Sequence, residues 1–225
     1  MKVKSVVKIM NFHSLLRVNS ARNRAEELDL YEKELFSMID SILNNKNFIL
    51  DKKMLLPPIG KKDLIVYIGN DYGFCSNFNS NINDAIKKDL DSDKILIGKK
   101  LISTATNIIM SFDKDKFYDE ISKINNYILE SIMNSKYSSI RVVYNHYYNV
   151  NKLGFVDKTI FPIKPLKESK NKYNEDFVVE GKISDILMNL VSIYIGNEIQ
   201  IAEASSWAAE NVMRQLVTKE SLDKI

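Results

Sequence analysis

The chain has 225 residues, of which 45% are hydrophobic and 27% are charged. This composition is typical of a globular body and excludes a disordered or fibrous chain. The 32 basic and 29 acidic side chains leave a net charge of only +3, so charge does not indicate a nucleic-acid partner, which a concentrated basic face would attract. The single cysteine, Cys75, excludes an internal disulfide and a cysteine-based zinc site, and it fits a reducing compartment.

The N-terminal stretch MKVKSVVKIMNFHS does not have the pattern of a secretion signal. Its apolar part is interrupted by Lys8 and is too short for the hydrophobic region of a signal peptide. No run in the chain approaches the ~18 apolar residues of a membrane-spanning helix. We therefore expect a cytoplasmic protein that does not span the membrane.

A long first helix is predicted from Val3 to about Leu43, because residues 1–56 contain neither glycine nor proline and are mostly good helix formers. Apolar and small residues recur there at the spacing of a coiled-coil seam. The members of this first set are Val7, Ser14, Ala21, Leu28, Leu35 and Ile42. A second set is predicted at Val3, Met10, Tyr31 and Met38, interrupted by Arg17 and Arg24, so the middle of the helix should pair loosely.

A second long helix is predicted from Lys182 to Ile225, a stretch without proline and with the single glycine Gly196. Its apolar positions alternate three and four residues apart. They are Ile183, Leu187, Leu190, Tyr194, Ile201, Ala204 and Ala208. Beyond them the seam continues as Asn211, Gln215 and Thr218, so another part of the molecule must hold the end of this helix.

The residues between the two helices predict a small α/β domain. The turn PPIGKK is followed by DLIVYIG and KILIG, β-branched runs typical of buried parallel strands. IRVVYN and GFVDKTIFPIK are a third and a fourth strand candidate, and helices are predicted over Asn77–Leu90, Lys100–Ile109 and Lys116–Met133. We expect a three-layer domain inserted between two antiparallel helices, with limits at 1–56, 57–176 and 177–225 and a polar loop over Pro165–Asp176.

Few residues in the chain can carry catalysis or hold a metal. The histidines are His13, in the helical seam region, and His146, after a strand candidate, so a metal cluster is not expected. The turn GNDYGFCSN follows a strand, where a phosphate loop would lie, but it lacks the glycine spacing of dinucleotide and phosphate loops. We interpret it structurally: Asp71 caps the turn, and Gly73 is expected to take a positive φ. No cofactor is expected.

Five segments resemble, in the correct order, segments of the gamma subunit family of F-type ATPases. GNDYGFCSNFNSNI is similar to the family's Asp-Arg-Gly-Leu-Cys-Gly-x-Phe/Tyr-Asn, although Tyr72 and Ser76 depart from it. The other four are VNSARNRAE, KILIGKK, RVVYNHYYN and ASSWAAENVMRQLVTKES. The resemblance assigns a structural role to the motif residues Asp71, Gly73, Cys75, Phe78, Asn79, Tyr144 and Asn145.

The resemblance implies a non-catalytic rotor shaft whose antiparallel coiled coil enters a hexamer of alpha- and beta-type subunits. An epsilon-type subunit and a membrane rotor ring are the further partners implied, in a complex at the inner face of the cell membrane. The candidate hexamer contacts are Ser14, Leu15, Arg17, Arg22, Arg24, Trp207, Glu210 and Arg214. Glu210 stands where the family has arginine, and Arg214, one turn further on, is expected to substitute for it against acidic lobes of the beta subunits.

Aligned with the family, the chain lacks residues at the start of the first helix and turns at the end of the last, so we expect a shortened tip. That difference keeps open a second hypothesis, the shaft of a paralogous rotary motor whose output is not proton translocation, for instance motility. A third hypothesis is a small α/β enzyme that binds a nucleotide at the turn of Asp71–Asn77, and a fourth is a coiled-coil adaptor that forms a homodimer.

Overall fold

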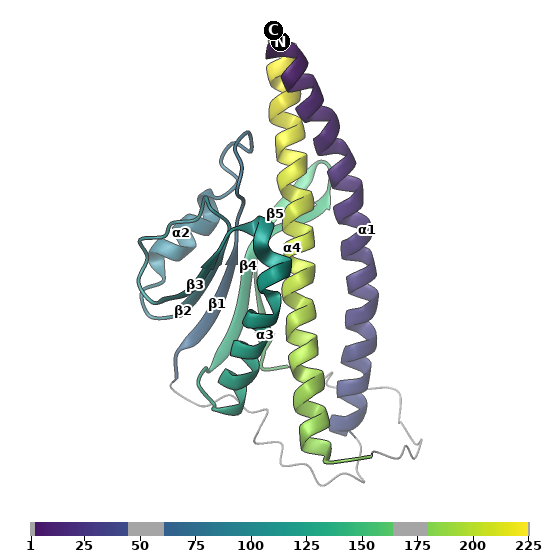
Figure 1. Ribbon diagram of the computed structural model, residues 1–225, viewed down its shortest axis with the longest axis vertical. Coiled ribbons are helices and arrows are strands. Elements are labelled where there is room, and N and C mark those ends of the chain that lie inside the picture. The colour runs from purple at the N-terminus through teal and green to yellow at the C-terminus, as the bar shows by residue number, and fades with distance from the viewer. Residues whose placement is uncertain (1–2, 45–60, 164–179, 225) are drawn as a thin grey trace.

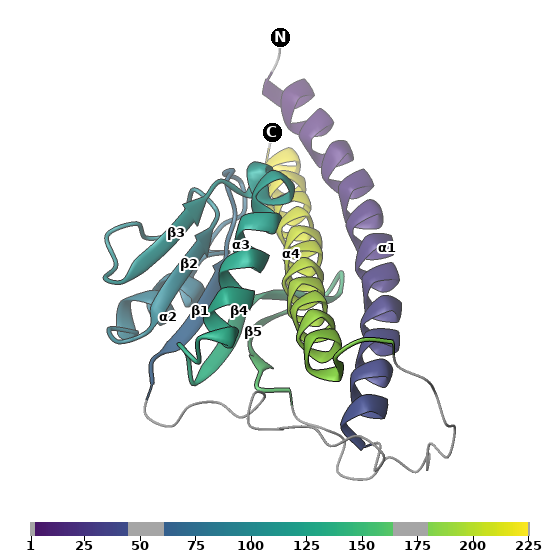
Figure 2. The ribbon, with the colours of Figure 1, turned by 60° about the horizontal axis from the view of Figure 1, so that its bottom comes forward.

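The computed structural model describes residues 3–44, 61–163 and 180–224. Within them, two long helices, α1 (Val3–Asn44) and α4 (Ile183–Asp223), lie side by side and antiparallel, and a compact head lies against α4 (Figures 1 and 2). The fold class predicted from the sequence is therefore confirmed. The polar loop, most of the PPIGKK turn and both predicted domain limits lie outside the described residues.

The head is built on one five-stranded sheet with the order β3-β2-β1-β4-β5. Strands β1 (Asp63–Ile68), β2 (Asp93–Ile97), β3 (Ile108–Phe112) and β4 (Ser139–Asn149) are parallel, and β5 (Lys152–Phe161) returns antiparallel to β4. The parallel strands have this order in Rossmann-like folds, in which β1 and β4 flank the point where the winding direction reverses.

Helices cover both faces of the sheet, which gives the expected three layers. Helix α2 (Ser80–Lys88) packs Ile82 and Ile86 on one face. Helix α3 (Phe117–Met133), preceded by the short helix η2 (Lys114–Lys116), shares the other face with α4. Because both faces are covered, β1 is buried from Leu64 to Ile68, as its continuous apolar run predicts.

The first set of seam positions on α1 is confirmed, whereas the second set is wrong at three of its four residues, Met10 being partly buried. Five residues of the first set are buried and Leu28 is partly buried. Val3, Tyr31 and Met38 are more than half exposed. The seam instead includes the residues four positions after the first set, which are Asn11, Val18, Ala25, Glu32 and Ile39. The error arises because three of these five side chains are polar or small, while the apolar Met10, Tyr31 and Met38 stood at competing positions.

The helix predicted over Lys100–Ile109 is also wrong. This segment forms turns and then enters β3, which the sequence did not indicate. β3 is a short edge strand in which no residue is fully buried: four are partly buried and Ser111 is exposed. Its pattern is therefore weak, and pairing with β2 decides the conformation.

None of the helices in the described part of the chain is long and apolar enough to cross a membrane.

Candidate functional site: the shaft and its joint with the head

The two long helices form a shaft that extends beyond the head, and both run to the same end of the molecule, which we call the tip (Figure 1). Small side chains allow the helices to approach closely along the seam. Ser14 and Ala21 of α1, and Ala204 and Ala208 of α4, are almost completely buried. A leucine in their place would separate the helix axes, so these positions set the thickness of the shaft.

Polar side chains hold the two helices together near the tip, where α4 lacks an apolar stripe. Asn11 Nδ2 donates to the carbonyl of Gln215 at 2.9 Å and to Thr218 Oγ1 at 3.0 Å. Asn211 and Thr218 are completely buried. The sequence predicts that another part of the molecule holds the end of α4, and α1 provides these contacts.

The candidate hexamer contacts divide into an exposed and a buried group. Leu15, Arg17, Arg22 and Arg24 are exposed on α1, and Arg24 lies 4.0 Å above the ring of Tyr118. Trp207 is partly buried on α4, and the remaining candidates, Ser14, Glu210 and Arg214, are buried within the chain itself.

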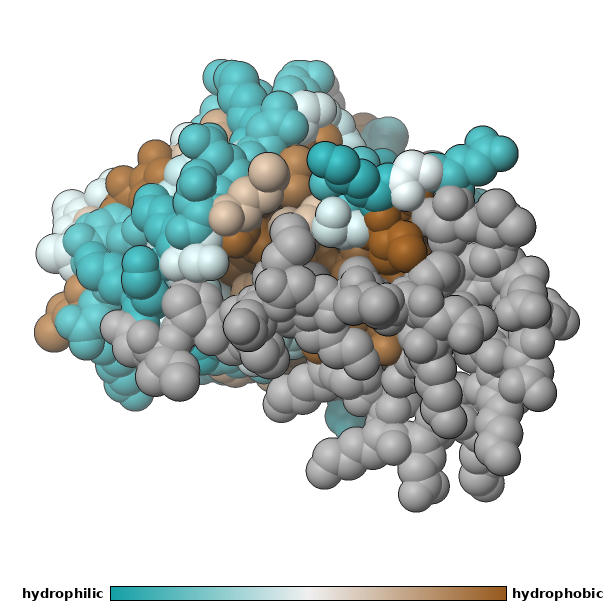
Figure 3. Space-filling model, turned by 90° about the horizontal axis from the view of Figure 1, so that it is seen from below, coloured by the Kyte–Doolittle hydropathy of each residue, from teal (hydrophilic) through white to brown (hydrophobic). Residues whose placement is uncertain are grey.

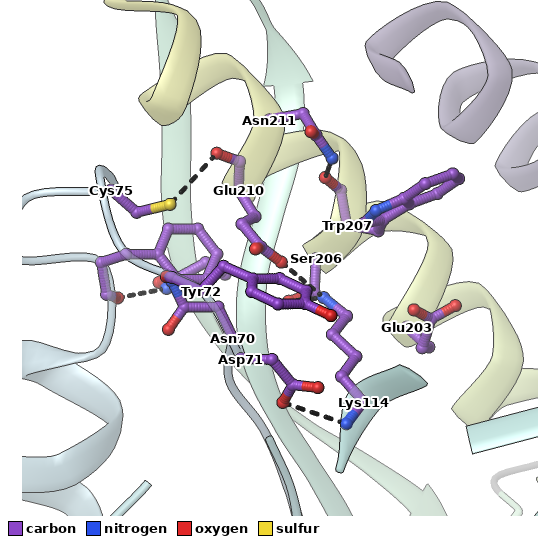
Figure 4. Close-up of polar contacts among 12 residues, drawn as sticks. Asn70, Asp71, Tyr72, Cys75, Lys114, Glu203, Ser206, Trp207, Glu210 and Asn211 are labelled. Atoms are coloured by element: carbon purple, nitrogen blue, oxygen red, sulfur yellow. Dashed lines mark hydrogen bonds and ion pairs between the residues drawn. The ribbon is translucent and has the colours of Figure 1, made fainter. Parts of the chain in front are cut away.

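Glu210 is the centre of a buried ion cluster that joins the head to the shaft (Figure 4). Its Oε1 accepts from Arg214 Nη2 at 2.5 Å, and its Oε2 lies 3.3 Å from Lys114 Nζ, which comes from η2 of the head. Lys114 Nζ also contacts Ser206 Oγ at 3.4 Å. Two cations thus compensate one carboxylate at a site with almost no access to water.

Asp71 holds three loops together at the carboxyl end of the sheet. Its Oδ1 accepts the backbone N–H groups of Lys99 at 2.7 Å and Lys114 at 3.0 Å, and its Oδ2 accepts that of Asp115 at 3.2 Å. A buried carboxylate with three such donors is well stabilised without a ligand. Asp71 is therefore a structural residue, but its hydrogen bonds between described residues go to the loops after β2 and β3 and not to its own turn, which it was expected to cap.

The loop after β1 docks on α4. Cys75 and Phe78 are buried against Ala209, and Arg214 Nε approaches the carbonyl of Gly73 at 3.4 Å. Burial raises the pKa of the Cys75 thiol, which makes it a packing residue and not a nucleophile. The expected positive φ at Gly73 is wrong: Phe74 and Ser76 take it instead, at 61° and 49°.

The remaining motif residues hold the same loop against the end of β4. Asn145 Nδ2 donates to the carbonyl of Phe78 at 2.6 Å, and Asn79 Nδ2 donates to Asn70 Oδ1 at 2.7 Å. Tyr144 is buried, and its hydroxyl lies 3.3 Å from His146 Nδ1. Burial lowers the pKa of His146, so this histidine is neutral and structural at physiological pH.

A groove of about 790 Å³ lies between α1, α4 and the loop after β1. Arg17 and Arg24 line it from α1, Trp207 from α4, and Tyr72 and Phe74 from the loop. Among the described residues, no group of three or more histidine, cysteine or acidic side chains is arranged to hold a metal ion. The groove offers a mixed aromatic and charged surface of the kind that contacts another protein.

A long shaft, a head fixed to it by buried ions, and a strand-end loop packed on a helix define a structural subunit built as a shaft with a head. The protein-family model for ATP synthase matches residues 1–224. Gamma chains of ATP synthase are similar in sequence: that of Mycoplasma mycoides subsp. mycoides SC is 25% identical over 96% of this chain and 80% of its own length. That of Mycoplasma mobile is 34% identical over 75% of this chain and 64% of its own.

Solved central-stalk structures share the fold. A chain of the central stalk and c-ring of the Tetrahymena thermophila mitochondrial ATP synthase superposes with a TM-score of 0.65 and 16% identity, covering 96% of this chain and 99% of that one. A chain of the Euglena gracilis mitochondrial rotor gives a TM-score of 0.50 and 13% identity, covering 95% and 91%. The chain belongs to the family of ATP synthase gamma chains.

Proposed function

We propose that this chain is the central rotor shaft of an F-type rotary ATPase and couples ATP turnover in an alpha-beta hexamer to rotation and proton translocation. It carries no catalytic chemistry of its own, because this family is the non-catalytic central stalk. The observation that carries the proposal is the antiparallel pair of α1 and α4, which extends beyond the head with both helices running to the tip.

The surface of the chain supports a different partner at each end. Near the tip, α1 exposes apolar and basic side chains, including Phe12, Leu16 and Arg17. At the opposite end, apolar side chains are visible between hydrophilic ones (Figure 3), and the first turns of α4 carry the partly exposed Ile183 and Ile186. We assign the tip to the alpha- and beta-type subunits and the opposite end to an epsilon-type subunit and a membrane rotor ring.

These partners imply a peripheral position at the cytoplasmic, inner face of the cell membrane. Within the hexamer, Leu15, Arg17, Arg22, Arg24 and Trp207 are the candidates that remain available for contact. The roles of Glu210 and Arg214 change, because each already has an ionic partner inside the chain. This buried pairing also accounts for the glutamate at position 210, where the family has arginine. The difference therefore does not require a motor of a different kind.

Purification of the complex from the native host, followed by native mass spectrometry, tests the proposal. We expect one copy of this chain with three alpha-type and three beta-type subunits. Membrane-ring subunits in the same complex would support proton translocation, whereas an intact hexamer with another membrane or surface partner would support the paralogous motor. Recovery as a homodimer without ATPase subunits would contradict both and favour an adaptor.

A further inference from the structure

Two carboxylates on different helices share one lysine where the middle of the shaft meets the head. Glu198 of α4 accepts Lys158 Nζ of β5 at 2.8 Å and 2.7 Å through its two oxygens. Glu32 of α1 lies 3.7 Å from the same ammonium and close enough to Glu198 for the two carboxylates to interact electrostatically. Between described residues, this is the only ion pair that connects α1 with another part of the chain.

The cluster contains more negative than positive charge. Glu198 is 1% exposed at its side chain and Glu32 is 19% exposed, so neither carboxylate is well hydrated. Asp29 of α1 adds a third carboxylate nearby, although it is paired with Lys33 at 3.0 Å. One ammonium cannot compensate both Glu32 and Glu198.

The other groups that face the cluster do not supply a second positive charge. Tyr194 of α4 is neutral, since burial and the nearby Glu198 raise its pKa. Tyr144 of β4 is neutral, since burial and the nearby Glu198 raise its pKa. His146 of β4 has a lowered pKa because of burial and the nearby Lys158. A proton on Glu32 is the remaining way to balance the site.

We propose that the junction of α1, α4 and β5 is a proton-operated clamp, in which a proton held between Glu32 and Glu198 fixes α1 against α4 and the head. Loss of that proton leaves two negatively charged carboxylates facing each other and loosens the middle of α1. The clamp goes beyond the shaft function proposed above and does not depend on it, because every contact lies within this chain.

The direction of the pH dependence follows from the direction in which the pKa of Glu32 is shifted. Burial, then the hydrogen bond and charge of Glu198, raise the pKa of Glu32 from 4.5 to about 7. The clamped state therefore binds the proton more tightly than a state in which α1 has opened. The stabilisation is complete below the ordinary pKa, declines as pH rises, and is lost once the pH passes about 7.

Hydrogen exchange of the purified full chain tests the clamp. After correction for the intrinsic exchange rate, we expect the opening constant of α1 around Glu32 to rise by up to about tenfold per pH unit from pH about 5 to about 7, and then to level off. Glu32→Gln should abolish this rise, because glutamine is neutral and can donate to Glu198 at every pH. Glu34→Gln, an exposed change on the same helix, should leave the rise unchanged.

An opening constant that does not depend on pH in the unmodified chain would overturn the clamp. The same conclusion would follow if Glu32→Gln showed the full pH dependence of the unmodified chain. If that variant does not fold, the carboxyl carbon of Glu32 can be titrated by NMR in the unmodified chain. A midpoint near 7 supports the clamp, and a midpoint at the ordinary glutamate value contradicts it. Failure to find a hexamer would leave these outcomes unaffected.

Discussion

At the scale of single residues, position 210 shows how a charge can be misassigned from sequence alone. A glutamate in place of the family's arginine suggested an altered contact with another subunit. The structure gives Glu210 two partners within the chain, Arg214 on the next turn and Lys114 from the head. The i, i+4 spacing of Glu210 and Arg214 was visible in the sequence, whereas Lys114, 96 residues away, was not.

Arg214→Glu should destabilise the isolated chain, because it places two carboxylates in a buried site with Lys114 as the only nearby cation. Removing one partner of a buried pair costs about 3–5 kcal/mol, which should be evident as a lower melting temperature in thermal unfolding. The double change Glu210→Arg with Arg214→Glu restores one pair of opposite charges on α4 and should recover part of that loss.

Arg17→Glu is the matched control, since Arg17 is exposed and has no ionic partner among the described residues. Its effect on unfolding should stay within about 0.5 kcal/mol. Equal destabilisation by Arg17→Glu and Arg214→Glu would show that Arg214 does not form the buried pair described above.

At the scale of elements, the regions that depend on local pattern were predicted well. The helix expected over Val3–Leu43 is Val3–Asn44, and the helix expected from Lys182 is Ile183–Asp223. β3 and the residues that continue the seam beside the first set could not be predicted, because long-range contacts decide them. β3 depends on pairing with β2. Asn11 and Glu32 occupy seam positions because the partners that satisfy them lie on α4 and β5.

The small residues in the seam lead to a test of helix spacing. Ala21 is completely buried between α1 and α4, so Ala21→Leu should overpack the seam and cost about 1–3 kcal/mol. Asn19→Leu introduces the same side chain at an exposed position of the same helix and should be close to neutral. Chemical denaturation of both variants checks the difference. If Ala21→Leu were neutral as well, the helices would be further apart than the structure shows.

At the scale of the whole molecule, the two helices of the shaft are not equivalent. α4 packs against α1, α3, β4 and β5, whereas α1 packs chiefly against α4. The head is therefore fixed to α4 by apolar packing and by the Lys114 cluster, while α1 is attached along one face. A clamp at Glu32 can release the middle of α1 without detaching the head, because α4 also holds the head.

This asymmetry has a consequence for how freely each helix can vary. A saturation scan that scores folded yield should find that most positions from Tyr194 to Ala209 of α4 reject polar or larger substitutes, because nearly every side chain there is covered. Along α1, intolerance should recur only every three or four residues, at Ser14, Val18 and Ala21. If the positions that reject substitution recurred at the same spacing in both helices, that result would contradict the packing described above. Folding alone should therefore constrain α4 along most of this stretch, and α1 along one face only.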